Sequence, residues 1–435
     1  MKGLLRRIFT KGTFASNVAT LSSGTAIGQI SVILAAPLLS RLFTPSDFGQ
    51  LQFVLSIGLI LGALSSLRYE MALPLANNKT DALNILVLSV GLAGVISIIS
   101  VIVYFVEPRY LDQFYQTSAI KQLIFFVPII LLLEAKNNIF SFWFSRTKNF
   151  KVPSIAKSII GLSTALAQIT IALSGLVSGL GLLIGYVFGQ LASVGWYIAM
   201  FIRTKGFESP KKVSIQGVLE QARIHKKFPL FSSWNILLNT ISRNLPPLLL
   251  VSYFSVAEAG FYAIGIRLLN MPLNTLGMSV GQVYYQQIAR YKDQGIPMMP
   301  LLISTVGKLA GIIIIPLLIV FFTGEQLFAF VFGDSWSMAG RIAASMVPFY
   351  LMRFIASPLS TIFAVLGKQH LGLLWQLFYT LVTFGSFYYT RAYADFGFTI
   401  KTYSLAGAIA FMVLALVTIY ATYQADKHTR LDPQK

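Results

Sequence analysis

Cysteine is absent from the 435-residue sequence, and histidine occurs only three times, at His225, His370 and His428. Without cysteine the chain has no disulfide framework, no thiol nucleophile and no thiolate metal site. The scattered histidines do not match the ligand spacing of a metal site, and no glycine-rich phosphate loop follows a strand pattern. We therefore expect no metal, no cofactor, no catalytic residue and no nucleotide-hydrolysing machinery.

Charge is also scarce. Only 11% of the residues are charged and 55% are hydrophobic, whereas a soluble domain carries about 25% charged residues. The mean hydropathy is +0.71, and apolar runs of 20 residues or more recur. This composition predicts an all-α protein that crosses a membrane several times.

The first apolar run, about residues 16–40, follows the basic segment "MKGLLRRIFTKGTF" and is too long for the core of a signal peptide, so we expect it to be a retained span. The net charge of +19 would suggest nucleic acid in a soluble protein. Here basic cytoplasmic loops explain it better, and we expect no nucleic-acid partner.

We predict twelve spans, at about 16–40, 49–69, 83–106, 122–145, 153–174, 178–202, 229–252, 257–284, 299–323, 338–366, 371–390 and 403–423.

The basic residues predict the orientation. With the N-terminus in the cytoplasm, the tails and even-numbered loops hold 21 of the 34 Lys and Arg residues, and the odd-numbered loops hold 5. This asymmetry places both termini in the cytoplasm. The most basic loop, residues 203–228, divides the chain into lobes at 1–202 and 229–435. Six spans in each lobe make the lobes parallel repeats, related by an axis along the membrane normal.

A repeated polar segment supports the two lobes. "LFTPSDFGQLQF" at 42–53 returns as "YFSVAEAGFYAI" at 253–264, an offset of 211 residues. Thr44 with Asp47, and Ser255 with Glu258, have the spacing of a helix capping box. The segment therefore predicts the start of the second helix of each lobe rather than a substrate site.

Charges inside the spans are the candidate functional residues, because a buried charge is costly in a membrane. Eight basic residues but only Glu134 and Glu70 among the acids lie in or at predicted spans, so most cations there lack an acidic partner. Lys157 and Arg341 lie near span ends and can reach the interface. The basic residues are Arg68, Lys136, Lys157, Arg243, Arg267, Lys308, Arg341 and Arg353.

Polar residues at helical spacing extend several of these positions into stripes. Arg267 shares a helix face with Asn270 and Asn274, and Arg243 shares one with Asn239. Arg353 shares a third with Ser357 and Ser360. Such stripes either bond helices to each other or line a hydrated cationic cavity between the lobes, which we favour because three of them carry arginine. At the offset of 211, Arg267 matches Ser56. The predicted binding residues are Arg267, Arg243, Arg353, Lys136, Lys308, Arg68, Asn270, Asn274 and Asn239.

Four segments carry a resemblance to a known family: "LSRLFTPSDFGQLQFVLSIGLILGAL" (39–64), "LRYEMALPLANN" (67–78), "YFSVAEAGFYAIGIRLLNMP" (253–272) and "VFGDSWSMAG" (331–340). The chain resembles the Wzx-type O-antigen and polysaccharide flippases of the multidrug/oligosaccharidyl-lipid/polysaccharide exporter superfamily. The resemblance implies a bacterial inner-membrane transporter, not an enzyme. It would move undecaprenyl-pyrophosphate-linked oligosaccharide to the outer leaflet by alternating access, as in lipopolysaccharide biosynthesis. Its expected partners are the membrane lipids, a polysaccharide polymerase and glycosyltransferases.

Arginine suits this cargo, since it binds pyrophosphate through paired hydrogen bonds. The membrane potential would favour outward movement of the negative charge, and proton or sodium counter-transport is a further energy source. Glu134 is the candidate coupling residue, because burial favours the protonated form of a carboxyl group.

Four alternatives stay open. A multidrug-type cation antiporter should have an acidic cavity, which eight in-span cations disfavour. A membrane glycosyltransferase, polymerase or ligase needs a catalytic acid or base, often on a large external loop; the longest external loop here, about 107–121, is short and lacks histidine. A lipid II flippase would normally have two more helices than 435 residues provide, and an ion channel is disfavoured by the two-lobe repeat.

Overall fold

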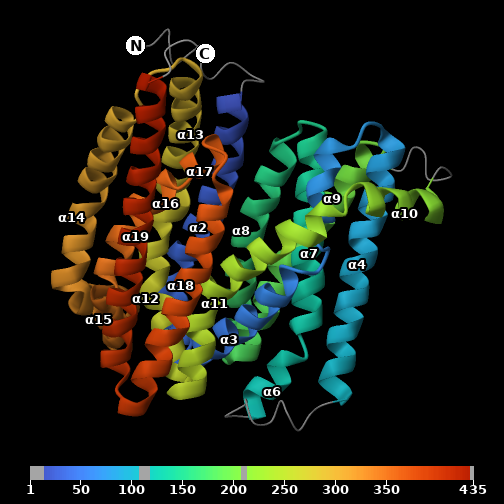
Figure 1. The fold of residues 1–435 in the computed structure, drawn as a ribbon. Coiled ribbons are helices and arrows are strands. Elements are labelled where there is room, and N and C mark those ends of the chain that lie inside the picture. Colours follow the sequence, from blue (N-terminus) through green and yellow to red (C-terminus); the bar gives the residue numbers. More distant parts are fainter. Residues whose placement is uncertain (1–13, 107–117, 207–212, 432–435) are drawn as a thin grey trace. The chain divides into compact units, whose positions relative to one another are not determined.

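The computed structural model describes residues 14–106, 118–206 and 213–431, and within these ranges every regular element is helical. This confirms the predicted all-α membrane fold (Figure 1). Nine helical segments of the described ranges are long and apolar enough to cross a membrane. They are Ser23–Leu42, Lys79–Val106, Ile120–Arg146, Lys151–Leu173, Gly179–Arg203, Met299–Phe332, Val347–Val365, Gln369–Tyr393 and Phe396–Lys427.

The chain folds into two compact units, which we call the first unit (residues 1–252) and the second unit (residues 253–435). The basic linker at 203–228, and the lobes at 1–202 and 229–435 that it would separate, stay predictions. In the first unit the helices are α2 (Phe14–Leu42), α3 (Pro45–Gly62), α4 (Lys79–Val106), α6 (Ser118–Ile124), α7 (Val127–Arg146), α8 (Lys151–Leu173), α9 (Gly179–Arg203), α10 (Ile215–Ile224) and α11 (Ser233–Tyr253), with the short turns η1 (Tyr69–Leu75) and η3 (Phe228–Ser232).

The second unit opens with α12 and ends with the long helix α19. Its elements are α12 (Val256–Pro272), η4 (Leu273–Gly277), α13 (Met278–Asp293), α14 (Met299–Phe332), η5 (Asp334–Trp336), α15 (Ser337–Ser345), α16 (Val347–Leu359), α17 (Ile362–Val365), α18 (Gln369–Thr390), η6 (Arg391–Tyr393) and α19 (Phe396–Leu431).

Three of the twelve predicted spans have no counterpart among these nine segments, and they coincide with α3, α11 and the α12–α13 segment. The predicted span 49–69 ends early at Gly62, and the chain then turns through Leu67 and Arg68, whose φ angles are 48° and 63°. Pro272 ends α12 in a π-helical turn, because proline has no N–H to continue the hydrogen-bond ladder.

Proline also divides the predicted span 338–366. The break falls at Met346, just before Pro348, and a second break follows Pro358. The result is three short helices, α15, α16 and α17, where the apolar run predicts one continuous helix.

The repeated polar segment forms the helix starts that its sequence predicts. Thr44 caps α3, since its hydroxyl accepts from the Asp47 N–H (3.3 Å) and the Asp47 carboxylate accepts from the Thr44 N–H (2.9 Å). Ser255 caps α12 by accepting from the Glu258 N–H (3.2 Å). The two segments therefore begin equivalent helices, as the repeat predicts.

Glycine lets three helices of the first unit touch backbone to backbone. A Cβ on Gly161 of α8 would lie 2.1 Å from the Gly28 carbonyl oxygen of α2. Gly24 and Gly28 form a GxxxG pair on α2, and Gly185 and Gly189 form another on α9, which packs on α8. Small residues at this spacing are typical of helices that pack closely in membranes.

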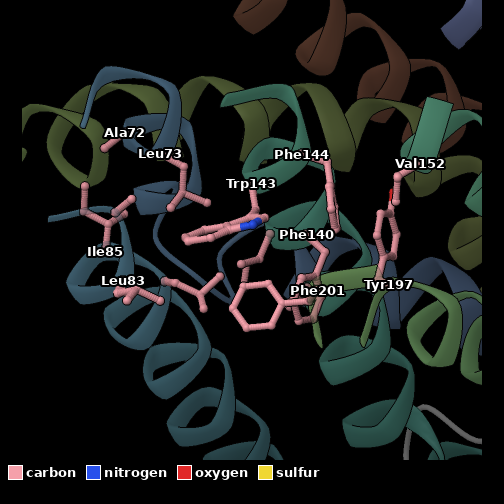
Figure 2. Packing of buried hydrophobic residues seen from close by; sticks show 14 of the residues in the cluster. Ala72, Leu73, Leu83, Ile85, Phe140, Trp143, Phe144, Val152, Tyr197 and Phe201 are labelled. Carbon is pink, nitrogen blue, oxygen red and sulfur yellow. The ribbon is translucent and has the colours of Figure 1, made fainter. Parts of the chain in front are cut away.

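Buried rings fill the space between α7, α9 and the start of α4. Figure 2 shows Trp143, Phe140 and Phe201 beside Leu73 and Leu83. The Phe140 ring lies 5.7 Å from that of Phe201, edge to face. This core fixes α7 against α9, and those two helices carry the polar cluster of the first unit.

Candidate functional site

Arg353 of α16 lies over aromatic rings. Its guanidinium carbon is 5.7 Å from the centroids of both the Phe349 and Tyr350 rings. Within the described ranges no carboxylate lies within 4.0 Å of this arginine. The ring faces carry partial negative charge, so they stabilise the cation. This leaves the guanidinium, which is partly exposed, able to bind an anion.

The rings under Arg353 belong to a buried aromatic cluster of the second unit. Trp375 stacks on Tyr379 with 5.4 Å between centroids, and the hydroxyls of Tyr379 and Tyr403 are 3.4 Å apart. Phe349 packs against both tyrosines. The cluster joins α16, α18 and α19, so it holds the helix that carries Arg353 in a fixed position.

Arg267 lies on α12, on the side away from the packed glycine of that helix. A Cβ at Gly265 would lie 2.7 Å from the Ala339 carbonyl oxygen, so this face of α12 contacts α15. Two residues further along a helix a side chain points to nearly the opposite side. Arg267 and Asn270 are both partly exposed. The side chain of Asn274 lies outside the described residues.

Lys308 is exposed on α14, away from the buried stripe formed by Thr305, Leu309 and Ile313. In the first unit, Lys136 of α7 and Asn239 of α11 are partly exposed, and Arg243 of α11 is exposed. Whether these residues share one cavity with Arg267 and Arg353 stays a prediction.

Arg68 is neutralised within its own turn. Its guanidinium lies 3.1 Å from a carboxylate oxygen of Glu70, which is 2% exposed. The Ser66 hydroxyl donates to the other oxygen of that carboxylate. The left-handed backbone at Arg68 brings the two charges together. Arg68 is thus the predicted binding residue with the clearest local acidic partner.

Glu134 of α7 is the centre of a hydrogen-bonded polar cluster in the first unit. The Tyr186 hydroxyl donates to its Oε1 (2.5 Å), and the Gln190 amide donates to the same oxygen (2.6 Å). The Gln190 amide also donates to the Tyr186 hydroxyl (2.8 Å). An ionised carboxylate can only accept hydrogen bonds, so these two donors to one oxygen stabilise the ionised form of Glu134.

The hydrogen bonds continue away from the carboxyl group. The Ser193 hydroxyl donates to Oδ1 of Asn137 (2.7 Å), and the Asn137 amide donates to Oε1 of Gln190 (2.6 Å). Asn137, Gln190 and Ser193 are buried. Each hydrogen bond in this series points toward Glu134. A change in the protonation of Glu134 therefore alters the whole series of hydrogen bonds.

The sequence found Glu134 but not its partners. Asn137, three residues further along α7, carries the bond to Gln190. A signal existed on the neighbouring helix: Tyr186, Gln190 and Ser193 follow the i, i+4, i+7 spacing in an apolar span.

A separate pocket of about 700 Å³ lies in the second unit and contains none of the predicted binding residues. Glu258, Asp395 and Lys401 line it together with the ion pair of Arg341 and Glu325. Phe321 and Phe322 form its apolar side. Glu258, in the first turn of α12, thus lines a pocket.

Comparisons with known proteins agree with this architecture. The sequence profile of a family described as "Polysaccharide biosynthesis protein" matches residues 38–340. No curated protein shows significant sequence similarity to the chain.

Solved structures share the fold at low identity. The lipid II flippase MurJ in an inward closed conformation has a TM-score of 0.70 at 12% identity, covering 95% of this chain and 90% of MurJ. An inward-facing multidrug resistance MATE transporter of the MOP superfamily has a TM-score of 0.64 at 13% identity, covering 94% and 95%.

A MOP superfamily transporter from Pyrococcus furiosus, described by a binding pocket of reverse polarity, has a TM-score of 0.58 at 14% identity, covering 95% of this chain and 96% of that one. The fold is therefore that of the MOP-superfamily transporters, a multi-pass membrane fold. Since the family profile spans well over half of the sequence, the chain belongs to the polysaccharide biosynthesis protein family.

Proposed function

We propose that the protein flips an undecaprenyl-pyrophosphate-linked oligosaccharide, such as an O-antigen repeat unit, from the inner to the outer leaflet by alternating access. The single observation that carries the proposal is Arg353, a cation in a membrane helix held by ring faces and not by a carboxylate. Membership of a polysaccharide biosynthesis family supports a glycan cargo.

The chemistry of arginine fits the pyrophosphate. A guanidinium binds phosphate oxygens through two parallel hydrogen bonds, and its charge stays fixed at every physiological pH. In this proposal Arg267 and Arg353 of the second unit hold the pyrophosphate. Asn270 of the second unit offers a further donor to phosphate or sugar, and the binding roles of Arg243, Lys136 and Asn239 in the first unit stay predictions.

The driving force need not come from a nucleotide. A membrane potential that is negative inside favours outward movement of negative charge by about 2.3 kcal/mol per charge per 100 mV. We propose the Glu134 cluster as the site where a counter-transported proton or sodium ion is bound. Its carboxylate has two donors on one oxygen, and binding a cation there would rearrange the hydrogen bonds to Asn137.

The proposal includes a location and partners. The protein would lie in the bacterial inner membrane with both termini in the cytoplasm, as the distribution of Lys and Arg predicts. Glycosyltransferases would supply its cargo, and a polysaccharide polymerase would consume it.

The multidrug-type cation antiporter is the second candidate, because MATE transporters share the fold. The Glu134 cluster is the observation that favours it, since a carboxylate in a membrane helix can bind a cation. Arg353 and Arg267 weigh against it, because cations repel an organic cation.

A cellular experiment tests the flippase. In a strain that lacks its own flippase for a defined surface glycan, and that the wild-type gene restores, Arg267→Ala and Arg353→Ala should abolish surface glycan at normal protein levels. The matched control is Arg391→Ala, because Arg391 is also an arginine over a ring, 3.8 Å from the Tyr388 centroid, but is exposed at the end of the span Gln369–Tyr393.

Normal glycan display in both variants would refute the binding role. Loss of folded protein would instead indicate that these arginines serve packing. Arg353→Lys separates the two cases, since it keeps the cation over the rings but loses the paired donors.

A further inference from the structure

α10 is a short helix of the first unit that Figure 1 shows lying across the end of α4. The small and polar side of α10 faces the protein. A Cβ at Gly217 would lie 2.5 Å from the Asn84 amide nitrogen of α4, and Gln221 is 6% exposed. The Tyr69 hydroxyl donates to the Ala222 carbonyl oxygen (3.1 Å).

The flanks of α10 are fixed as well. Val213 and Phe228 pack against the buried ring core of the first unit. The protein therefore sets the rotation of this helix about its axis, and the outward side chains are not free to turn inward.

In this orientation of α10, apolar side chains point away from the protein. Ile215 is 81% exposed and Leu219 is 54% exposed. They lie one turn apart, and the next residue of the same stripe is the exposed Arg223. A stripe that passes from apolar to cationic is typical of a helix in the interface of a bilayer.

The depth of α10 agrees with such a position. Lys79 begins the membrane helix α4 and donates to the carbonyl oxygen of Lys205, just beyond the end of the membrane helix α9 (2.8 Å). Asn84, which faces Gly217, is five residues further along α4. At 1.5 Å per residue this is about 7 Å, within the 5–10 Å depth of interfacial helices.

The charges around α10 identify the lipid. Exposed cations surround it, and the one exposed acid of the helix itself is Glu220. Basic residues at a membrane surface are attracted to anionic lipid headgroups. The exposed cations are Arg203, Lys205, Arg223, Lys226 and Lys227.

We infer that the outward face of α10, formed by Ile215, Leu219 and Arg223, docks on the surface of a bilayer that contains anionic phospholipid. The first unit is thereby anchored to the membrane surface at the segment that leads toward α11. This inference needs only the membrane fold and is independent of the transported substrate.

The absence of cysteine makes the test direct, because each single cysteine is unique. Nitroxide labels at Ile215→Cys, Leu219→Cys and the matched control Glu220→Cys would be compared in full-length protein in vesicles of phosphatidylethanolamine and phosphatidylglycerol. Accessibility to oxygen reports lipid, and accessibility to a water-soluble nickel chelate reports water. We expect labels at 215 and 219 to be reached by oxygen and shielded from nickel, and the label at 220 to show the reverse.

Two outcomes would overturn the docking. Labels at 215 and 219 that nickel reaches as readily as the label at 220 would place this face in water. Labels shielded from both reagents would place it against protein.

The anionic requirement has its own test. In phosphatidylcholine vesicles the label at 219 should shift toward water, and the change Arg223→Gln/Lys226→Gln/Lys227→Gln should give the same shift in the original vesicles. If the label at 219 in the otherwise wild-type protein has the same accessibility in both kinds of vesicle, the helix does not require anionic lipid. This outcome holds whether or not the triple variant folds.

Discussion

Both units contain close glycine contacts and buried rings, but the pair α2 and α8 of the first unit and the group α16, α18 and α19 of the second unit are packed in different ways. In the first unit, Gly28 and Gly161 bring α2 and α8 into backbone contact. In the second unit, α16, α18 and α19 meet through the rings of Phe349, Tyr379 and Tyr403. Backbone contact brings two helices close together, whereas rings offer faces that can hold a cation.

The charges differ in the same way. The first unit surrounds Glu134 with neutral donors and pairs Arg68 with Glu70, so its in-span carboxylates have partners within the unit. The second unit rests Arg353 on rings. This difference favours a division of roles, with coupling in the first unit and anion binding in the second.

The strongest test of the packing difference is Gly161→Leu. A Cβ there would lie 2.1 Å from a backbone oxygen of α2, which cannot move without the helix. We expect loss of folded protein, measured as monodisperse protein on size exclusion after detergent extraction. Gly195→Leu is the matched control, because a Cβ at Gly195 meets nothing within 4 Å. If both variants fold equally well, α2 and α8 do not depend on this contact.

Glu134→Gln tests the coupling role of the first unit. Glutamine has the same shape and can still accept from Tyr186 and Gln190, but it does not titrate. We expect transport in vesicles to fall roughly tenfold, which corresponds to about 1.4 kcal/mol, and to lose its dependence on pH. Tyr186→Phe, which removes one donor and no charge, should have a smaller effect. Full transport with an unchanged pH profile in Glu134→Gln would exclude this residue from coupling.

Asp426→Ala tests how the second unit fixes its long helices. The buried Asp426 of α19 accepts from the N–H groups of Met298 and Met299, at 2.8 Å and 2.9 Å, and so caps α14 from 127 residues away. The variant should lose about 2 kcal/mol of stability, because two donors of a helix start lose their acceptor. Thermal unfolding in detergent measures this loss, and Asp395→Ala serves as an exposed control, since its carboxylate accepts from Phe398 at the start of α19 (3.0 Å). If Asp426→Ala loses less stability than Asp395→Ala, the link between α14 and α19 is dispensable.

The smallest effect concerns the repeated helix starts. Thr44→Ala removes both the acceptor for the Asp47 N–H and a donor to the Asp47 carboxylate (2.7 Å), so it should cost about 1 kcal/mol. Ser255→Ala removes one acceptor and should cost less. Unfolding of the two variants in one detergent compares them directly, and a larger loss for Ser255→Ala would contradict the account.

Much of the fold follows from the sequence, because long apolar runs and helix caps are local signals. The runs that became α4, α8, α9 and α18 match their predicted spans within a few residues. The breaks at Met346 and after Pro272 were missed, since apolar composition outweighed proline in defining the spans.

The site was predicted less completely. Single charges such as Glu134 and Arg353 stand out in an apolar helix, but their surroundings depend on contacts between helices. Gln190 is 56 residues from Glu134 in sequence, and no local pattern links the two. The rings under Arg353 are local, since Phe349 and Tyr350 lie one turn before it on α16, but the tyrosines that pack on Phe349 come from α18 and α19.

The most direct measurement is flipping in vesicles that contain the purified protein and a fluorescent undecaprenyl-pyrophosphate oligosaccharide, followed by chemical quenching of the label in the outer leaflet. We expect protein-dependent flipping that is lost in the Arg267→Ala/Arg353→Ala variant and kept in Arg391→Ala. Flipping by the double variant at the wild-type rate would contradict the claim that arginines of the second unit bind the pyrophosphate.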